Sequence, residues 1–234
     1  MIVSVNQPYF APYPGFFLKA NLSDYFVILD DVQFPRGTTW ISRNRFKNDQ
    51  GTLWMTVPVH KKGLGLQKIS DLRICHPGNW GKKHLRSFRN AYAHAPYLHE
   101  HLGLMERVLS EQFDRLLEFN MEIIDYILGY LGIDTRLVPM SRLGVTGKGT
   151  PLIIEICKAL GATQFMVQSS AVGYYHPALF ESAGIELISY KKPDYVYPQL
   201  WGDFIANLSV LDMMFTCGPK AREIILASVP PPRA

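Results

Sequence analysis

The sequence predicts an α/β protein with a Rossmann-like, mainly parallel five-stranded sheet. Apolar, β-rich runs occur near residues 2, 26, 135, 164 and 185. Segments with helical periodicity separate most of them, and this alternation is typical of a parallel sheet with helices on its faces. A stretch that is first β-rich and then helical interrupts this alternation at about residues 34–132. We therefore expect a single α/β domain over residues 1–228 that carries an insertion.

The chain begins with a predicted β–loop–α–β unit. An apolar run at residues 2–5 precedes a loop with three prolines and a glycine, a short apolar segment that carries Lys19, and a second β-rich run at residues 25–29. Two pairs of polar residues follow these runs, Asn6 with Gln7 and Asp30 with Asp31. Ligands of parallel sheets bind beyond the carboxyl ends of the strands, so these side chains predict a site at that edge.

The catalytic prediction rests on the two aspartates and on two nearby arginines, Arg43 and Arg45. Asp30 or Asp31 would act as the base that deprotonates an incoming amine or hydroxyl group. Adjacent carboxylates point to opposite sides of a strand, so no metal ligand is assigned to them. The cofactor stays open, with Mg²⁺ shared with a phosphate as the candidate.

The insertion contains two strand candidates and then three helices. Residues 53–57 and 68–74 are strand candidates, and the glycine- and lysine-containing loop between them predicts a hairpin or a mobile flap, with a solvated turn as the alternative. Trp80, His84, Phe88 and Tyr92 recur every four residues and define one face of a basic amphipathic helix. His84 is either a ligand-binding residue or a packed core histidine. Apolar positions at 98–109 and 117–131 predict two further helices, the second ending at Gly132.

The second half of the predicted sheet carries two candidate binding loops. Residues 144–150 combine glycines and Lys148 before a helix with an expected N-cap at Thr150, a combination that favours anions. An ordinary flexible connection is the alternative. Residues 168–176 follow the next strand, and there Ser169 and Tyr175 are either ligand contacts or parts of a tight turn.

The C-terminal region adds an aromatic segment at residues 190–199, in which Tyr197 and Gln199 would contact a sugar or base. Packing across the sheet edge is the competing interpretation. The sequence from Ser209 to Asp212 matches a capping box at the start of a helix. Residues 229–234, rich in proline, are predicted to be disordered.

Composition argues against a disordered protein, a zinc-binding protein and a membrane-spanning protein. The content is 47% hydrophobic and 19% charged, as in globular proteins with a sizeable core, and the net charge of +4 is compatible with an anionic substrate. Three widely spaced cysteines have no zinc-type spacing. No apolar stretch approaches a membrane span and no signal-type segment precedes the first strand, so we expect a cytoplasmic protein.

These motifs together resemble the WbqC-like family. The matching segments are Asn6-Gln7-Pro8, Pro12-Tyr13-Pro14-Gly15, Lys19, Asp30-Asp31-Val32-Gln33-Phe34, Arg43-Asn44-Arg45, Trp54 to Val57-Pro58, Lys83-His84, the region of Lys148, Tyr197 with Gln199, and Ser209 to Gly218. Members usually have histidine where this chain has Asn6. Asparagine cannot titrate near neutral pH, so a family mechanism that uses the histidine as acid or base would not carry over.

The resemblance implies a transferase in cell-surface polysaccharide biosynthesis of the O-antigen type, with aminoacyl transfer onto an amino sugar as a specific form. An anionic sugar nucleotide or an activated amino acid would be the substrate, and tRNA a partner if it carried the aminoacyl group. The alternatives are a nucleotidyl or adenylyl transferase and a non-catalytic ligand- or RNA-binding protein. The predicted binding residues are Asn6, Gln7, Lys19, Gln33, Asn44, His84, Lys148, Ser169, Tyr175, Tyr197 and Gln199.

Overall fold

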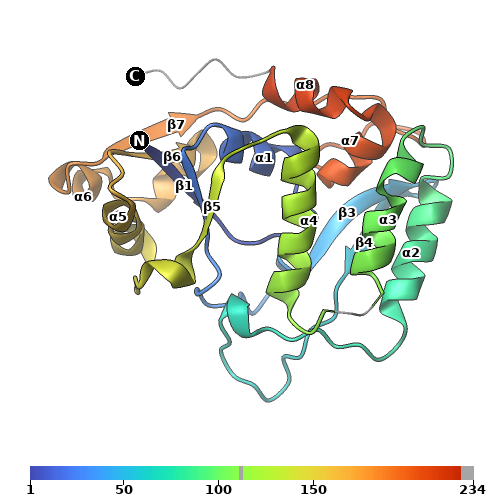
Figure 1. Cartoon of the computed structure of the whole chain (residues 1–234), viewed down its shortest axis with the longest axis horizontal. Coiled ribbons are helices and arrows are strands. Elements are labelled where there is room, and N and C mark those ends of the chain that lie inside the picture. The colour runs from blue at the N-terminus through green and yellow to red at the C-terminus, as the bar shows by residue number, and fades with distance from the viewer. Residues whose placement is uncertain (111–112, 228–234) are drawn as a thin grey trace.

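A five-stranded parallel sheet forms the centre of the protein, as a computed structural model of residues 1–110 and 113–227 describes it (Figure 1). Its order is β5 (Arg136–Pro139), β2 (Tyr25–Ile28), β1 (Ile2–Asn6), β6 (Gln164–Gln168) and β7 (Glu186–Tyr190). Every pairing in it is parallel. The predicted α/β class and its five strands are confirmed, whereas the predicted disordered tail at 229–234 lies outside the described residues.

Helices cover both faces of the sheet, so the side chains that alternate along each strand are buried on both sides. On one face Val3, Val5 and Val27 pack with α5 (Gly149–Leu160) and α6 (Pro177–Ser182). On the other face Phe26 and Ile28 join a larger core with α1 (Pro14–Asn21), α4 (Leu116–Leu131), α7 (Val210–Cys217) and α8 (Lys220–Leu226). Strands buried on both faces explain why the predicted runs are apolar throughout.

The insertion folds differently from the predicted hairpin. Strand β3 (Arg43–Asn48) pairs antiparallel with β4 (Gly51–Thr56), whereas residues 68–74 contain only a short 3₁₀ helix at Ile69–Asp71 and isolated bridges. The prediction that residues 53–57 pair with residues 68–74 was therefore wrong. The turn uses Gly51 at φ 102°, a conformation that favours glycine. Strand β3 was missed because it alternates charged residues with Asn44 and Phe46.

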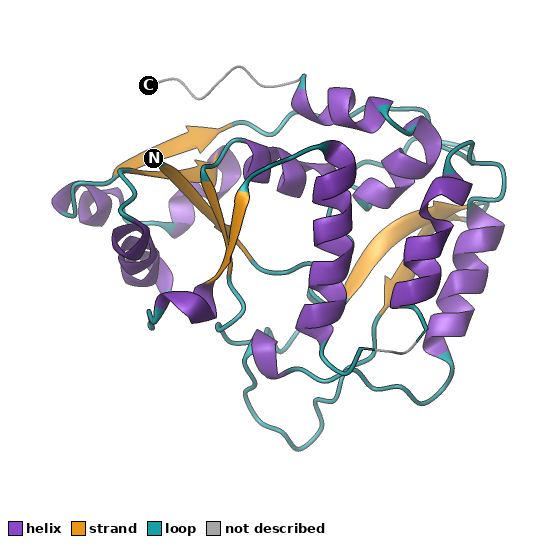
Figure 2. Ribbon diagram, viewed as in Figure 1, coloured by secondary structure: helices purple, strands orange, loops and turns teal. Residues whose placement is uncertain are grey.

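Two further helices follow the hairpin along the chain, and both are drawn in front of it in the view of Figure 2. The predicted amphipathic helix is α2 (Trp80–Ala91), and α3 (Leu98–Val108) follows it. The rings of Phe46 and Phe88 lie 4.8 Å apart, so α2 covers the inner face of the hairpin. Helix α4 ends at Gly132 in the left-handed conformation, as expected. The insertion thus shares the larger core with the sheet.

Helix starts differ in detail from the sequence prediction. Helix α5 begins at Gly149, and the Thr150 hydroxyl accepts a hydrogen bond from the His176 amide at 3.1 Å instead of capping its own helix. Ser209 caps α7 by accepting from the Leu211 amide, but Asp212 is buried in another network and does not complete the box. Within the residues that the structure describes, every helix is too short or too polar to cross a membrane.

Candidate functional site

A pocket of about 410 Å³ opens beyond the carboxyl ends of β1 and β6. The chain builds β2 and β5 on one side of β1, and β6 and β7 on the other, so the strand order reverses between β1 and β6. Open α/β sheets bind ligands in the crevice at this reversal. The lining residues are Asn6, Tyr9, Tyr13, Trp40, Asn44, Arg45, Gln168, Lys192 and Asn207.

Asn6 ends β1, and a lysine holds its side chain. The Lys19 ammonium donates to the Asn6 Oδ1 and to the Val5 carbonyl, both at 2.7 Å. Burial lowers the pKa of Lys19 to about 7. Burial also raises the pKa of Tyr9, and its contact with Asn6 opposes that shift. Asn6 therefore presents a fixed amide to the pocket, with a titratable lysine behind it.

Strand β3 supplies Asn44 and Arg45 to the opposite wall. The buried Asn44 amide donates to the Phe10 and Ala11 carbonyls at 2.9 and 2.7 Å, which fixes the proline-rich loop after β1. The Arg45 guanidinium donates to the Asn207 carbonyl at 3.0 Å and so ties β3 to the segment before α7. The insertion is thus part of the pocket wall.

Two exposed tryptophans extend the wall outward. Trp40 and Trp54 stack with ring centroids 5.7 Å apart, and they are 41% and 43% exposed. The Arg43 guanidinium lies 3.7 Å from the Trp54 ring centroid, and Arg45 lies 5.5 Å from that of Trp40. Large exposed indoles are unusual on a protein surface and often mark binding sites. Trp40 is both part of this stack and part of the pocket lining.

The segment after β7 closes the remaining side. The Lys192 ammonium donates to the Asn207 Oδ1 at 3.0 Å and to the Pro193 carbonyl at 3.2 Å. A Cβ at Gly15 would lie 2.5 Å from Tyr13 and 2.8 Å from Lys192, so the lack of a side chain there lets both approach the start of α1.

The lining carries a positive charge. Arg45 and Lys192 contribute cations, and the described lining residues include neither carboxylate nor imidazole. Neither cation belongs to an ion pair among the described residues. Amide, phenol and indole groups complete the wall. This combination suits a ligand with an anionic group and a polar ring.

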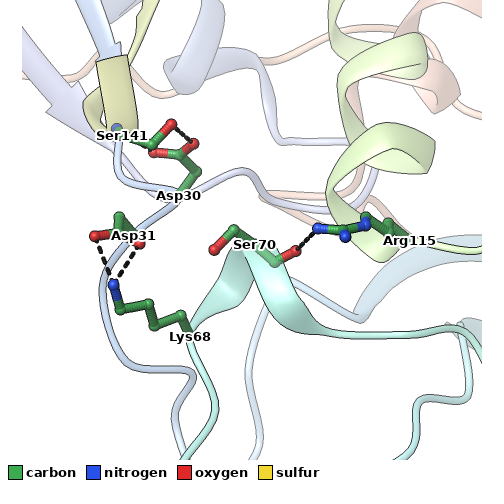
Figure 3. Close-up of polar contacts among 6 residues, drawn as sticks. All are labelled: Asp30, Asp31, Lys68, Ser70, Arg115 and Ser141. Carbon is green, nitrogen blue, oxygen red and sulfur yellow. Dashed lines mark hydrogen bonds and ion pairs between the residues drawn. The ribbon is translucent and has the colours of Figure 1, made fainter. Parts of the chain in front are cut away.

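The two predicted catalytic aspartates lie at the end of β2 and do not line this pocket (Figure 3). Asp30 is buried and accepts from the Ser141 amide at 3.0 Å and the Ser141 hydroxyl at 2.6 Å. Asp31 pairs with Lys68 at 2.8 Å. The carboxylates point to opposite sides of the chain, as expected for adjacent residues. Their catalytic role stays a prediction.

Asp30 turns toward Ser141 because β2 has β5 as its other neighbour, and Ser141 follows β5 directly. On the far side of this region Arg115 donates to the Ser70 carbonyl at 3.1 Å (Figure 3). Among the described residues, no group of three or more histidine, cysteine or acidic side chains is placed to hold a metal ion.

The other predicted binding residues of the first half lie outside the pocket lining. Gln7 accepts from the Asn6 amide through its backbone carbonyl, and Gln33 forms an isolated bridge with Lys68. The His84 Nε2 lies 2.9 Å from the Thr56 carbonyl, and burial lowers its pKa. This geometry matches the core-histidine interpretation.

The predicted residues of the second half have structural partners or an exposed position. Lys148 precedes α5 and is exposed. Ser169 donates to the Tyr190 carbonyl at 2.9 Å, and the Tyr175 ring packs 5.3 Å from that of Phe165.

Tyr197 and Gln199 form hydrogen bonds with the buried side chains of Asp212 and Lys47. The Tyr197 hydroxyl donates to Asp212 at 2.9 Å, and Tyr92 donates to the same carboxylate at 2.8 Å. The Gln199 Oε1 accepts from the buried Lys47 ammonium at 3.2 Å. Burial raises the pKa of Asp212, and the two phenol hydrogen bonds oppose that shift.

Of the predicted residues, Asn6, Asn44 and Arg45 line the pocket, and Lys19 contacts Asn6. The lining residues that the prediction did not include are Tyr9, Tyr13, Trp40, Gln168, Lys192 and Asn207. Gln168 carried a usable signal, since it ends a buried strand as Asn6 does. Trp40, a large aromatic residue in the polar stretch before β3, was a second indication of a binding site.

The fold and the position of the pocket define an α/β protein with a candidate site at the switch point of a parallel sheet. The chain belongs to the WbqC-like protein family, whose profile matches residues 7–224. It is 32% identical over 225 residues to the uncharacterized protein Rv1507c of Mycobacterium tuberculosis (strain ATCC 25618 / H37Rv), covering 95% of this chain and 96% of that protein. No solved structure matches the chain.

Proposed function

We propose that this protein is a cytoplasmic transferase that binds its substrate in the pocket between the ends of β1 and β6. The observation that carries the proposal is the lining itself, in which two cations without carboxylate partners face amide, phenol and indole groups at a sheet switch point. The substrate class is an anionic sugar derivative or an activated amino acid. The reaction belongs to cell-surface polysaccharide biosynthesis of the O-antigen type, as the family resemblance suggests.

The pocket is large enough for such a ligand. A volume of about 410 Å³ lies within the range of small-molecule sites, roughly 300–1,000 Å³. Trp40 offers an aromatic surface to a ring, Arg45 and Lys192 pair with an anionic group, and Asn6 and Gln168 bind hydroxyl or amino groups. These contacts bind and orient substrates.

The proposed reaction is aminoacyl transfer onto an amino sugar. The amine attacks the carbonyl carbon of an ester or thioester, a C–N bond forms, and the leaving group departs with the amine proton. The described lining residues include no carboxylate or imidazole that would take this proton. The prediction that Asp30 or Asp31 takes it therefore requires a substrate that reaches from the pocket to the end of β2.

A thermal-shift screen of the purified protein tests the proposal, with nucleotides, nucleotide sugars, amino acids and aminoacyl-tRNA, each with and without Mg²⁺. A ligand that binds only the folded state raises its Tm. We expect a nucleotide sugar or aminoacyl donor to raise the Tm of the wild type more than that of Gln168→Ala. Equal shifts in both proteins would contradict the assignment of the pocket.

A nucleotidyl or adenylyl transferase is the second candidate, because doubly wound sheets bind nucleotides at the switch point where this pocket lies. A Tm shift with ATP, dependent on Gln168, would favour it over the glycan transferase. Binding without any turnover of donor and acceptor would instead favour a ligand-binding protein.

A further inference from the structure

A second, smaller cavity adjoins the pocket. It has a volume of about 90 Å³ and shares Lys192 and Asn207 with the pocket lining. Tyr195 and Tyr197 also line it, and the Tyr197 hydroxyl is already bonded to Asp212. The cavity holds a group of a few atoms but no sugar ring. It extends the pocket toward the segment that follows β7.

Two buried phenol hydroxyls, one of them from a residue that lines this cavity, have no hydrogen-bond partner among the described residues. They belong to Tyr190 and Tyr195, which are 5% and 8% exposed. The charge state of Tyr13, which lines the pocket, affects both of them, so the three phenols lie close together. Buried polar groups without partners destabilise a fold, and they are uncommon unless a ligand or water satisfies them.

Both phenols are hydrogen-bond donors at neutral pH. Burial raises the pKa of Tyr190 and of Tyr195 well above the usual phenol range, and the neighbouring Tyr13 adds to the shift. The Lys192 ammonium lies 5.4 Å from the Tyr195 ring centroid. Its two hydrogen bonds, to Pro193 and Asn207, leave one of its three hydrogens for a ligand.

We propose that this cavity is a subsite for a small oxyanion, the carboxylate or phosphate group at one end of the ligand whose remainder occupies the pocket. The inference deepens the proposed function and rests on it. The Lys192 ammonium supplies the charge, and the Tyr195 hydroxyl donates a hydrogen bond to an anionic oxygen. Asp194 also lines the cavity, but it is exposed, so water screens its charge.

Calorimetric titration of the protein with sodium phosphate and with sodium acetate, at constant ionic strength, tests the subsite. We expect one of the two anions to bind, which identifies the group as phosphate or carboxylate. Tyr195→Phe and Lys192→Met should each weaken that binding about tenfold or more, because each removes a hydrogen bond to a charged group. Lys191→Met and Tyr174→Phe alter exposed neighbours outside the cavity and should bind as the wild type does.

Tyr195→Phe also has an expected effect without any anion. It removes a buried hydroxyl that has no partner, so the Tm of the ligand-free variant should equal or exceed that of the wild type. Weaker anion binding in a protein of unchanged or higher stability cannot come from misfolding. No binding of either anion, or equal binding by the wild type and both cavity variants, would overturn the subsite.

The subsite and the proposed function fail in different ways. A sugar or aminoacyl ligand whose affinity depends on Gln168 and Lys192, but not on Tyr195, would keep the function and remove the subsite. Anion binding that depends on Tyr195, in a protein without any such larger ligand, would keep the subsite and remove the function.

Discussion

Two regions at the same edge of the sheet contain polar residues that follow apolar strands, and they differ in how those residues are satisfied. At the end of β2, Asp30 is bonded to Ser141 and Asp31 to Lys68. In the pocket beyond the ends of β1 and β6, Arg45 of β3 and Lys192 of the segment after β7 have no carboxylate partner among the described residues and line the cavity. The comparison separates carboxylates that bind neighbouring side chains of the protein from cations that bind only carbonyl and amide oxygens and whose charge is therefore open to an anionic ligand.

The first prediction, with the largest expected effect, concerns the satisfied region. Asp30→Ala removes a buried carboxylate together with the two hydrogen bonds that it accepts from Ser141, so the free energy of unfolding should fall by about 2–3 kcal/mol. Urea denaturation measures this change. Ser141→Ala is the matched control, and the double variant should lose less than the sum of the two. An unchanged free energy of unfolding with lost activity would restore Asp30 as a catalytic candidate.

The second prediction concerns a core histidine that lies in neither region. His101 is fully buried, its Nδ1 is 2.8 Å from the Tyr126 hydroxyl, and burial lowers its pKa to about 4. The unfolded state therefore binds the proton first as the pH falls below about 6.5, and stability decreases. Between pH 7 and pH 5 the free energy of unfolding should drop by about 2 kcal/mol from this residue.

Denaturation of His101→Gln at both pH values measures this contribution, with His99→Gln as an exposed control on the same helix. The dependence of the free energy of unfolding on pH should become weaker in His101→Gln but not in His99→Gln. An equal pH dependence of unfolding in both variants would assign it to another titratable group.

The third prediction sharpens the comparison at the pocket. Gln168→Ala should weaken binding of the ligand that the screen identifies about tenfold, through loss of one or two hydrogen bonds. Its free energy of unfolding should stay close to that of the wild type, because no described residue hydrogen-bonds to the Gln168 side chain. Gln164→Ala, at the opposite end of β6, is the control and should bind normally. Similar losses in both variants would indicate a general effect on the strand.

The fourth prediction uses the lysine behind Asn6. Burial lowers the pKa of Lys19 to about 7, so its positive charge is present below that pH and lost above it. Affinity for an anionic ligand should fall a few-fold as the pH rises from 6 to 8, as expected for a charge near the site. Titration of Lys19→Met across this range should give a flatter profile. A profile equally steep in that variant would assign the effect to another group.

The fifth prediction has the smallest expected effect. Asp31→Asn breaks an ion pair whose lysine is 54% exposed, and exposed pairs contribute little to stability. The Tm and the ligand affinity should both equal those of the wild type. A large loss of turnover with unchanged binding would show that Asp31 is the catalytic base.

The sequence predicted the sheet better than the site. Apolar strands that are buried on both faces could be predicted from the sequence. The helix that begins at Trp80 and the helix end at Gly132 could be predicted as well. The partners of β3 could not be predicted, because pairing depends on the turn at Gly51 and not on the polar run itself. Asn6 lies at the end of β1 and lines the pocket, and its role in binding stays a prediction.

Asp30 and Asp31 follow an apolar run just as Asn6 does, so the local sequence does not distinguish them. Only the order of the strands in the sheet shows that they lie in different regions. Asp30 binds Ser141 after β5, whereas Asn6 ends the strand that lies between β2 and β6, and no local pattern shows which strands are neighbours. Lys192 and Asn207 reach the pocket from a segment far along the chain. Their contribution comes from tertiary contacts, such as the bond between Arg45 and the Asn207 carbonyl.

The central claim is that the ligand binds between β1 and β6 and not at the end of β2. Side-by-side affinity measurements on Gln168→Ala and Asp31→Asn test it most directly, with the ligand identified by the screen. We predict about tenfold weaker binding for the first variant and wild-type binding for the second. Wild-type binding by Gln168→Ala together with lost binding by Asp31→Asn would contradict the claim and move the site to the end of β2.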